Sequence, residues 1–345
     1  MNVQEIISAF GSYYVKDQQN MSRLVRKMMQ GSKTLSLPGI RHIKTEETQY
    51  RSSNVTTSEM IQGYQHGFTP KGNVTFHPNT INLRPMKVDK SLAPDVIREN
   101  WLGFLSDDNK HPKDWPIVKY FMEKLVADQV ENDRELKLVY NGVYQEPTEG
   151  TAGDAVNVMD GFKKIMTDAA TASHVYPIHK VDGIGKLNAN EIFDQVETFD
   201  DAIPEFLTNV KMYIFMSPAM KKAYFRKLRA LGFYDVASAK GLSFTVDNTE
   251  HEIIGLPSMT GSTDIWATIP ANILHLTKRS KNNFDVQANH RDVDVMADWF
   301  EALGFEDNDL VFASTNTVEA NGDSQNGGEN TGNEGGEDTG NEGGE

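Results

Sequence analysis

The residues whose spacing is most suggestive of chemistry are His290, Asp292 and Asp294, which alternate along a short stretch. One imidazole and two carboxylates are a ligand set that divalent metals accept. If this stretch is a strand, alternate side chains share one face. That face is then more simply the solvent side of a strand that buries Val293 and Val295, so we expect a polar row here and no metal site.

Other candidates for chemistry are weaker. His174 with His179 is a poorer ligand pair, no Gly-x-Ser-x-Gly elbow accompanies Ser217, and Gly183-Ile-Gly185-Lys186 is only a glycine turn. The zinc-protease, phosphate-loop and dinucleotide motifs are missing, and the absence of cysteine excludes thiolate nucleophiles and sulfur-ligated zinc. The sequence therefore predicts no catalytic, cofactor-binding or metal site, and we expect a protein that is not an enzyme.

The clearest strand-turn-helix in the chain gathers positive charge. A buried strand is expected at residues 210–215, and a helix begins at Ser217-Pro218 and ends near Gly232. Cationic side chains crowd the outer face of this helix: Lys221, Lys222, Arg226, Lys227 and Arg229. They could bind phosphate, but a solvated face or a face between subunits is the interpretation we prefer.

Composition fits a soluble globular chain with two packed subdomains. The 345 residues are 38% apolar and 24% charged, and the mean hydropathy is −0.50. No apolar run approaches the ~18 residues of a spanning helix, and residues 1–10 lack the features of a signal peptide. We therefore expect no membrane contact and no export. Without disulfides, stability must come from packing or from assembly.

Charge is distributed unevenly along the chain. The net charge is −15, and residues 316–345 hold eight acids with no Lys or Arg, so the remainder carries −7. A body this acidic is a poor neutraliser of phosphates, so we expect no tight binding of nucleic acid. An acidic wall can nevertheless lie beside a polyanion without adhering to it.

The acidic end is also a short repeat, in which residues 327–334 are closely repeated at 335–342. This Gly-rich segment is almost without apolar side chains, so it cannot offset a chain entropy of roughly 1–2 kcal/mol per residue. We expect it to be disordered. It could be a solvating or docking segment, or simply a tolerated extension.

A long polar stretch suggests that part of the fold depends on another molecule. Between residues 40 and 73 only eight of 34 residues are apolar, with no helical period. A hairpin pattern follows at residues 74–88, with turn chemistry at His77-Pro78-Asn79. Because an isolated two-stranded ribbon is marginal in water, this arm is either a flexible loop or is ordered across a neighbouring molecule. The second possibility indicates an assembly protein.

The remaining periodicities predict an α+β chain. A long helix is expected from about residue 115 to 133, with Glu123 on its solvent or neighbour-facing side. Shorter helices are expected at residues 3–14, 24–29, 159–166 and 188–199. Further strands are expected at residues 242–246, 253–257, 265–269, 283–288, 293–297 and 310–313.

An ordered set of motifs runs over residues 68–313. In the first half they are Phe68-Thr-Pro-Lys-Gly-Asn-Val-Thr-Phe76, Asn79-Thr-Ile81, Met86-Lys-Val-Asp89 and Trp101-Leu-Gly-Phe104. In the second half they include Phe215-Met-Ser-Pro218, Arg229-Ala-Leu-Gly-Phe-Tyr234, Gly255-Leu-Pro-Ser-Met259, Leu274-His-Leu-Thr277 and Asp298-Trp-Phe-Glu-Ala-Leu-Gly-Phe305. In content and order this set resembles the major capsid proteins of tailed bacteriophages, most closely those of the crAss-like group.

The resemblance implies the tailed-phage (Hong Kong phage-type) capsid fold. Residues 1–45 correspond to its amino-terminal arm, and residues 46–90 to an extended loop that lies over the adjacent subunit. Residues 91–204 and 276–315 correspond to a peripheral domain with a spine helix near 115–133. Residues 205–275 correspond to an axial domain at the capsomer centre. Residues 150–173 and 316–345 match no element of the family.

The implied function is structural. Copies of the chain would form the hexamers and pentamers of an icosahedral head around packaged double-stranded DNA, assembled in the host cytoplasm. The implied partners are the chain itself and portal, scaffolding and head auxiliary proteins, with only non-specific proximity to DNA. Two alternatives stay open: an encapsulin-like shell around protein cargo, and an α+β enzyme, which should show a convergent site.

Overall fold

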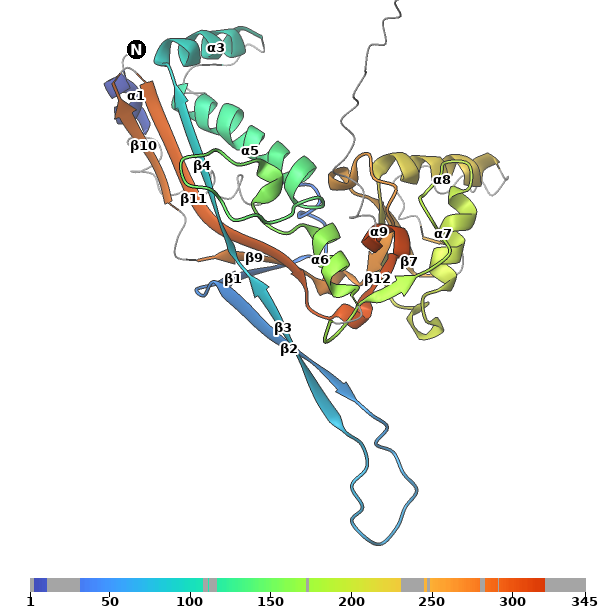
Figure 1. Cartoon of the computed structure of the whole chain (residues 1–345). Coiled ribbons are helices and arrows are strands. Elements are labelled where there is room, and N and C mark those ends of the chain that lie inside the picture. The colour runs from blue at the N-terminus through green and yellow to red at the C-terminus, as the bar shows by residue number, and fades with distance from the viewer. Residues whose placement is uncertain are drawn as a thin grey trace, which may run out of the picture.

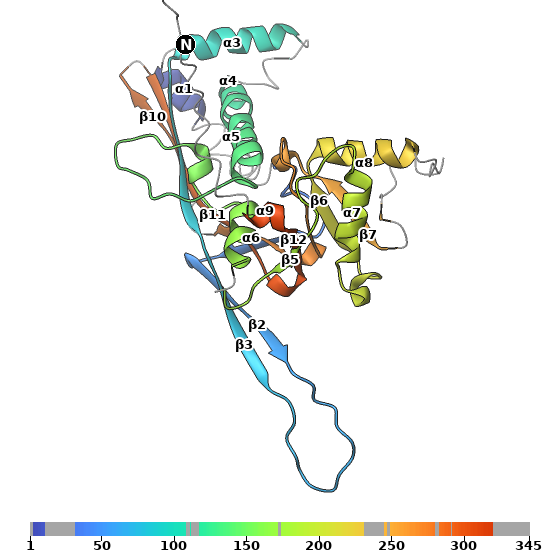
Figure 2. The same cartoon turned by 45° about the vertical axis from the view of Figure 1, so that its right-hand side comes forward.

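The computed structural model describes residues 3–10, 32–107, 111, 117–171, 174–230, 245–246, 249–279, 283–290 and 292–319. Two lobes lie side by side, and a two-stranded ribbon projects away from them (Figures 1 and 2). The predicted helix at 24–29 and the acidic repeat fall outside the described residues, as does most of the predicted strand at 242–246. In the described part of the chain, no helix is long and apolar enough to cross a membrane.

The first lobe is a five-stranded sheet covered by helices (Figure 1). Its strands are β1 (Arg41–Thr45), β4 (Arg84–Leu92), β9 (Ile273–Lys278), β10 (Asn283–Asn289) and β11 (Asp292–Phe305). The first half of β11 pairs with β10 and β4, and its last five residues pair with β9, which pairs in turn with β1. Three strands of this sheet therefore pair with β11 directly, and β1 is linked to it through β9.

A long helix spans this lobe. It runs without a break through four segments: α4 (Ile117–Tyr120), the π-helical η2 (Phe121–Val126), α5 (Ala127–Asp133) and the π-helical η3 (Arg134–Leu138). The predicted end near residue 133 was therefore wrong by five residues. The expected position of Glu123 was also wrong, because this side chain is buried. Phe121, Met122 and Val126 pack into the core against β11, as the apolar stripe predicts.

Smaller helices complete the first lobe. They are α1 (Val3–Phe10), α3 (Pro94–Asp107), η4 (Ala155–Asn157) and α6 (Phe162–Ala169). α6 confirms the helix predicted around Phe162, and both Phe162 and Met166 are buried in the core.

The second lobe is a five-stranded mixed sheet with two main helices. In spatial order its strands are β5 (His179–Val181), β12 (Val311–Ser314), β8 (Trp266–Thr268), β6 (Met212–Met216) and β7 (His251–Gly255). The helices are α7 (Ile192–Asp201), α8 (Pro218–Ala230) and the short carboxyl-terminal α9 (Thr315–Glu319). Single-turn helices η5 (Glu205–Leu207), η7 (Pro257–Met259), η8 (Pro270–Asn272) and η9 (Asn308–Leu310) join them.

Strand β6 is shared by two hydrophobic cores. Met212, Ile214 and Met216 pack with α7 and α8, whereas Tyr213 and Phe215 belong to the core of the first lobe. This division follows from the two-residue period of a strand. All five residues are buried, so the predicted buried strand is confirmed. The helix predicted for residues 188–199 corresponds to α7. Its predicted start was wrong, because α7 begins at Ile192 after a turn.

The ribbon is formed by β2 (Gln49–Thr57) and β3 (Val74–Asn82). They pair antiparallel from Gln49 opposite Asn82 to Thr57 opposite Val74. The hairpin predicted at residues 74–88 was therefore wrong: His77-Pro78-Asn79 lies inside β3, and residues 84–92 join the first sheet as β4. The true connection is the loop of residues 58–73.

A buried ion pair joins the long helix to β11. Arg134 Nη2 lies 2.8 Å from Glu301 Oε1, and both side chains are at most 2% exposed. Glu301 also accepts hydrogen bonds from Trp299 Nε1 at 3.1 Å and His275 Nε2 at 2.7 Å. Burial alone would raise the pKa of Glu301, but Arg134 and His275 outweigh it and lower the pKa from 4.5 to about 2.

We expect Glu301→Gln to lower the free energy of unfolding at pH 7 by about 3–5 kcal/mol, because it leaves the buried Arg134 charge without its partner. The contribution of Glu301 is present above pH 4.5 and is lost as pH falls toward about 2, since its folded-state pKa is depressed. Urea unfolding at pH 7 and pH 3 should therefore show a smaller difference between parent and variant at pH 3.

The matched control is Glu306→Gln, which breaks the half-exposed pair between Glu306 and Arg41. It should cost less than about 1 kcal/mol. Equal effects of the two substitutions at pH 7 would contradict the role assigned to Glu301.

Candidate functional site

The three residues with metal-ligand spacing do not form a site. His290 lies in the turn between β10 and β11 at φ +55°, and its Nδ1 is 2.8 Å from Asn289 Oδ1. Asp292 and Asp294 are partly exposed on β11, between buried Val293 and Val295, as predicted. Among the described residues, no three His, Asp or Glu side chains gather closely enough to hold a metal ion.

The weaker candidates lie apart from one another. His174 Nδ1 is 3.2 Å from the Tyr176 amide, and His179 Nε2 is 2.8 Å from Asp309 Oδ1. Ser217 is buried, and its Oγ accepts from the Met220 amide at 3.5 Å in the first turn of α8. Gly183 and Gly185 both have positive φ, which confirms the glycine turn.

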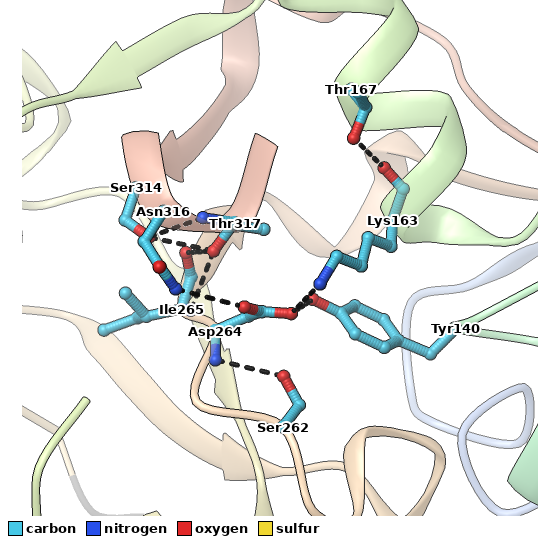
Figure 3. Close-up of polar contacts among 9 residues, drawn as sticks. All are labelled: Tyr140, Lys163, Thr167, Ser262, Asp264, Ile265, Ser314, Asn316 and Thr317. Atoms are coloured by element: carbon cyan, nitrogen blue, oxygen red, sulfur yellow. Dashed lines mark hydrogen bonds and ion pairs between the residues drawn. The ribbon is translucent and has the colours of Figure 1, made fainter. Parts of the chain in front are cut away.

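A polar cluster that the sequence did not reveal joins the two lobes (Figure 3). Asp264 Oδ2 accepts from Tyr140 Oη at 2.7 Å and from Lys163 Nζ at 3.0 Å. Burial, followed by the negative charge of Asp264, raises the pKa of Tyr140, so the phenol stays a hydrogen-bond donor. On the other side Thr317 exchanges hydrogen bonds with Ile265 at 3.1 Å.

We call this cluster the Asp264 clamp, because its hydrogen bonds and ion pair hold segments of the two lobes together. Tyr140 and Asp264 are nearly inaccessible to solvent, and the two surface hollows described below are lined by other residues. The partners come from the end of the long helix, α6, the loop before β8, and α9. Tyr140 and Lys163 lie more than 100 residues before Asp264, and Thr317 lies 53 residues after it, so no local motif could have indicated the cluster.

Two surface hollows stand out in the described structure. One, of about 190 Å³, lies at the base of the ribbon between β3, α6 and the end of β11. The other, of about 410 Å³, runs along α8 and is lined by Lys221, Lys222, Phe225, Arg226 and Arg229 with Pro218 and Gly255. Four of the five cations predicted to share the outer face of this helix line the second hollow, and Lys227 is not among its lining residues.

The most exposed apolar side chains of the described structure lie on the ribbon and its loop. Tyr64 and Phe68 are each 96% exposed and Ile61 is 85% exposed. The ribbon reaches away from both lobes in two views (Figures 1 and 2). Exposed apolar side chains gathered on one projection are typical of a surface that another molecule covers.

The base of the ribbon, in contrast, is firmly attached. Asn79 Nδ2 donates to Phe305 O at 2.8 Å, and the His77 ring stacks on Tyr176 with centroids 4.7 Å apart. Ile81 packs on Gly304 so closely that a Cβ at Gly304 would lie 2.3 Å from Ile81 Cδ1. The projection is therefore held at one end and free of the described body at the other.

Comparison with known proteins finds similarity in structure and none in sequence. No protein-family model matches the chain, and no curated protein sequence matches it. The structure resembles a chain of the satellite phage P4 procapsid that includes the size determination (Sid) protein, with a TM-score of 0.56 and 11% identity over 85% of this chain and 90% of that one.

A second similar structure is the capsid of a native GTA particle, with a TM-score of 0.50 and 11% identity over 80% of this chain and 87% of that one. At such identities the likeness concerns the fold. It confirms the α+β architecture that the sequence resemblance implied: the chain has the fold of tailed-phage (Hong Kong phage-type) capsid proteins.

Proposed function

We propose that the chain is the major capsid protein of a tailed bacteriophage, of the crAss-like group that its motifs resemble. Copies would form the pentamers and hexamers of an icosahedral head around double-stranded DNA. Portal, scaffolding and head auxiliary proteins are the further partners. The observation that carries this proposal is the projecting ribbon, which has exposed apolar side chains at its tip and an anchored base.

The parts of the fold have natural roles in such a shell. We assign residues 1–45 to the amino-terminal arm and the ribbon within residues 46–90 to the extended loop. The first lobe serves as the peripheral domain, with the long helix as its spine. The second lobe serves as the axial domain; besides residues 205–275 its sheet takes β5 and β12 from elsewhere in the chain.

Assembly would supply the surface that the ribbon lacks. Burial of apolar area on a neighbour contributes roughly 25 cal/mol per Å² before ordering costs are subtracted. A fully buried aromatic side chain is then worth about 1.5–3 kcal/mol. Each subunit both gives and receives such a contact, so modest contacts repeated around the shell sum to a stable container.

We expect the double variant Tyr64→Ser with Phe68→Ser to fold normally, because both side chains are almost completely exposed in the single chain. It should need at least about tenfold higher protein concentration to form particles, since two aromatic contacts are lost at every interface. Sedimentation velocity and electron microscopy of protein made with its scaffolding partner would measure this.

Phe206→Ser is the matched control, because it removes a ring that is 77% exposed but lies outside the ribbon. Unchanged assembly of the double variant would overturn the role of the ribbon.

The contents of the parent particles test the shell type: DNA supports the phage head, and enclosed protein would indicate an encapsulin-like compartment instead.

The anchor of the ribbon generates a separate prediction. Gly304→Ala should cost about 1–3 kcal/mol of stability and lower the yield of particles, because the new methyl group displaces Ile81 and with it the ribbon base. The pair Gly304→Ala with Ile81→Ala should be less destabilised than the sum of the two single changes. Thermal unfolding of the four proteins in a double-mutant cycle measures this coupling.

Gly103→Ala is the control for the glycine change, because no atom beyond its chain neighbours and the adjacent backbone of its own helix lies within 4 Å of its added Cβ. In the interior of α3 this substitution should be neutral or slightly stabilising. Simple additivity of the changes at Gly304 and Ile81 would show that they do not constrain each other.

A further inference from the structure

One face of α8 gathers positively charged side chains. Pro218, Lys221, Lys222, Phe225, Arg226 and Arg229 follow the three- and four-residue spacing that places side chains on one helical face. The same residues line the hollow of about 410 Å³. We call the four basic residues of this set the α8 cationic face.

The helix itself offers no compensation, because none of its 13 residues is acidic. Within the described part of the chain, Lys221, Lys222 and Arg226 make no ion pair. Burial lowers the pKa of Lys221, and the nearby carboxylate of Glu252 offsets only part of this shift. Glu252 itself pairs with Lys211, whose Nζ lies 3.5 Å from Glu252 Oε2. Like charges three and four residues apart also repel one another.

The floor of the hollow suits a slender chain rather than a bulky group. The stem of Lys221 lies on Gly255, where an added Cβ would come within 3.3 Å of Lys221 Cδ. Phe225 supplies an apolar patch between the cations. An extended, glycine-rich segment that carries carboxylates at intervals would fit this shape and charge.

The chain contains such a segment. The 26 residues after Glu319 include seven acids, nine glycines and no Lys, Arg or aromatic residue. Six of these acids lie in the repeat of residues 327–345. No other stretch of comparable length in this sequence combines so many carboxylates with so few bulky side chains.

The segment can also reach the face. α9 ends at Glu319 beside β12, and α8 packs on β7 at the far edge of the same five-stranded sheet. Adjacent strands are about 4.8 Å apart, so the sheet is roughly 20 Å across. Because Val318 of α9 packs in the core of the first lobe and α8 packs on the opposite face of the sheet, the path also passes round the sheet edge. The 26 residues from Glu319 to Glu345 can span about 86 Å when extended, which covers this path. Attachment to the same chain makes the local concentration high, of millimolar order.

We propose that the acidic segment of residues 327–345 binds the α8 cationic face of its own chain and thereby withholds this face from nucleic acid. The contact is electrostatic and salt-sensitive, since charges are screened within about 8 Å at 0.15 M salt and about 3 Å at 1 M. This contact is independent of the proposed shell function and can be tested on the dispersed full-length chain.

The first test is zero-length carbodiimide coupling of carboxylates to lysine amines, followed by mass spectrometry of the full chain. Carboxylates of residues 327–345 should couple to Lys221 and Lys222 at least fivefold more often than to Lys44 and Lys186, which are exposed elsewhere. The preference should vanish at 1 M salt. Equal coupling to all four lysines would overturn the proposal.

A pair of variants separates specific docking from general attraction. Lys222→Gln with Arg226→Gln should reduce coupling of the segment to the remaining Lys221 amine at least threefold. Lys44→Gln with Lys186→Gln removes the same charge and should leave that coupling unchanged. If both pairs reduce it equally, only the net charge matters and the docking proposal fails.

The second test measures binding of a short DNA duplex. A full-length variant in which the seven acids after Glu319 become amides should bind the duplex about tenfold more tightly than the parent at low salt. Adding Lys222→Gln and Arg226→Gln to that variant should reverse the gain. Unchanged duplex binding by the neutralised variant, or a gain that survives loss of these two cations, would contradict the proposal.

Discussion

The buried carboxylate of Glu301 is the constraint on which the arrangement of the first lobe depends. A charge in the interior is tolerated only when it is paired and fully hydrogen-bonded. Arg134 from the long helix, His275 from β9 and Trp299 from β11 together meet that requirement. β1, which leads into the ribbon, pairs with β9, and β4, which follows the ribbon, pairs with β11. The interactions of Glu301 therefore fix both chain segments that flank the ribbon.

The ribbon therefore has a rigid root and an unsupported tip. A two-stranded ribbon gains little stability in water by itself, and here its order derives from its base, where Ile81 meets Gly304 and His77 stacks on Tyr176. The rigid root holds the exposed rings of Tyr64 and Phe68 at a distance from the body that bears them. An extension of this kind is unfavourable for a single chain and useful when a second copy lies beneath it.

Sequence periodicity could predict elements whose burial follows one simple pattern. The uniformly apolar β6 and the amphipathic α6 are of this kind. It failed for the ribbon for two reasons. The partly buried face of β2 is mostly polar, with Ser52, Asn54 and Thr56, so the strand shows no apolar alternation, and Pro78 suggested a turn. In a two-stranded ribbon each strand is an edge, so proline is tolerated inside it. The Asp264 clamp and the Glu301 pair were also beyond prediction, because their partners are distant in sequence.

Net charge likewise gives an incomplete account of how this chain meets a polyanion. The whole sequence is strongly acidic, yet the described surface includes a helix with five cations and no acid. Electrostatic attraction acts over about 8 Å in physiological salt, so a local cluster governs contact whatever the total charge. In the proposed shell around DNA, carboxylates that stay close to this cluster would neutralise it, and attachment to the same chain would keep them close whether or not the subunits have assembled.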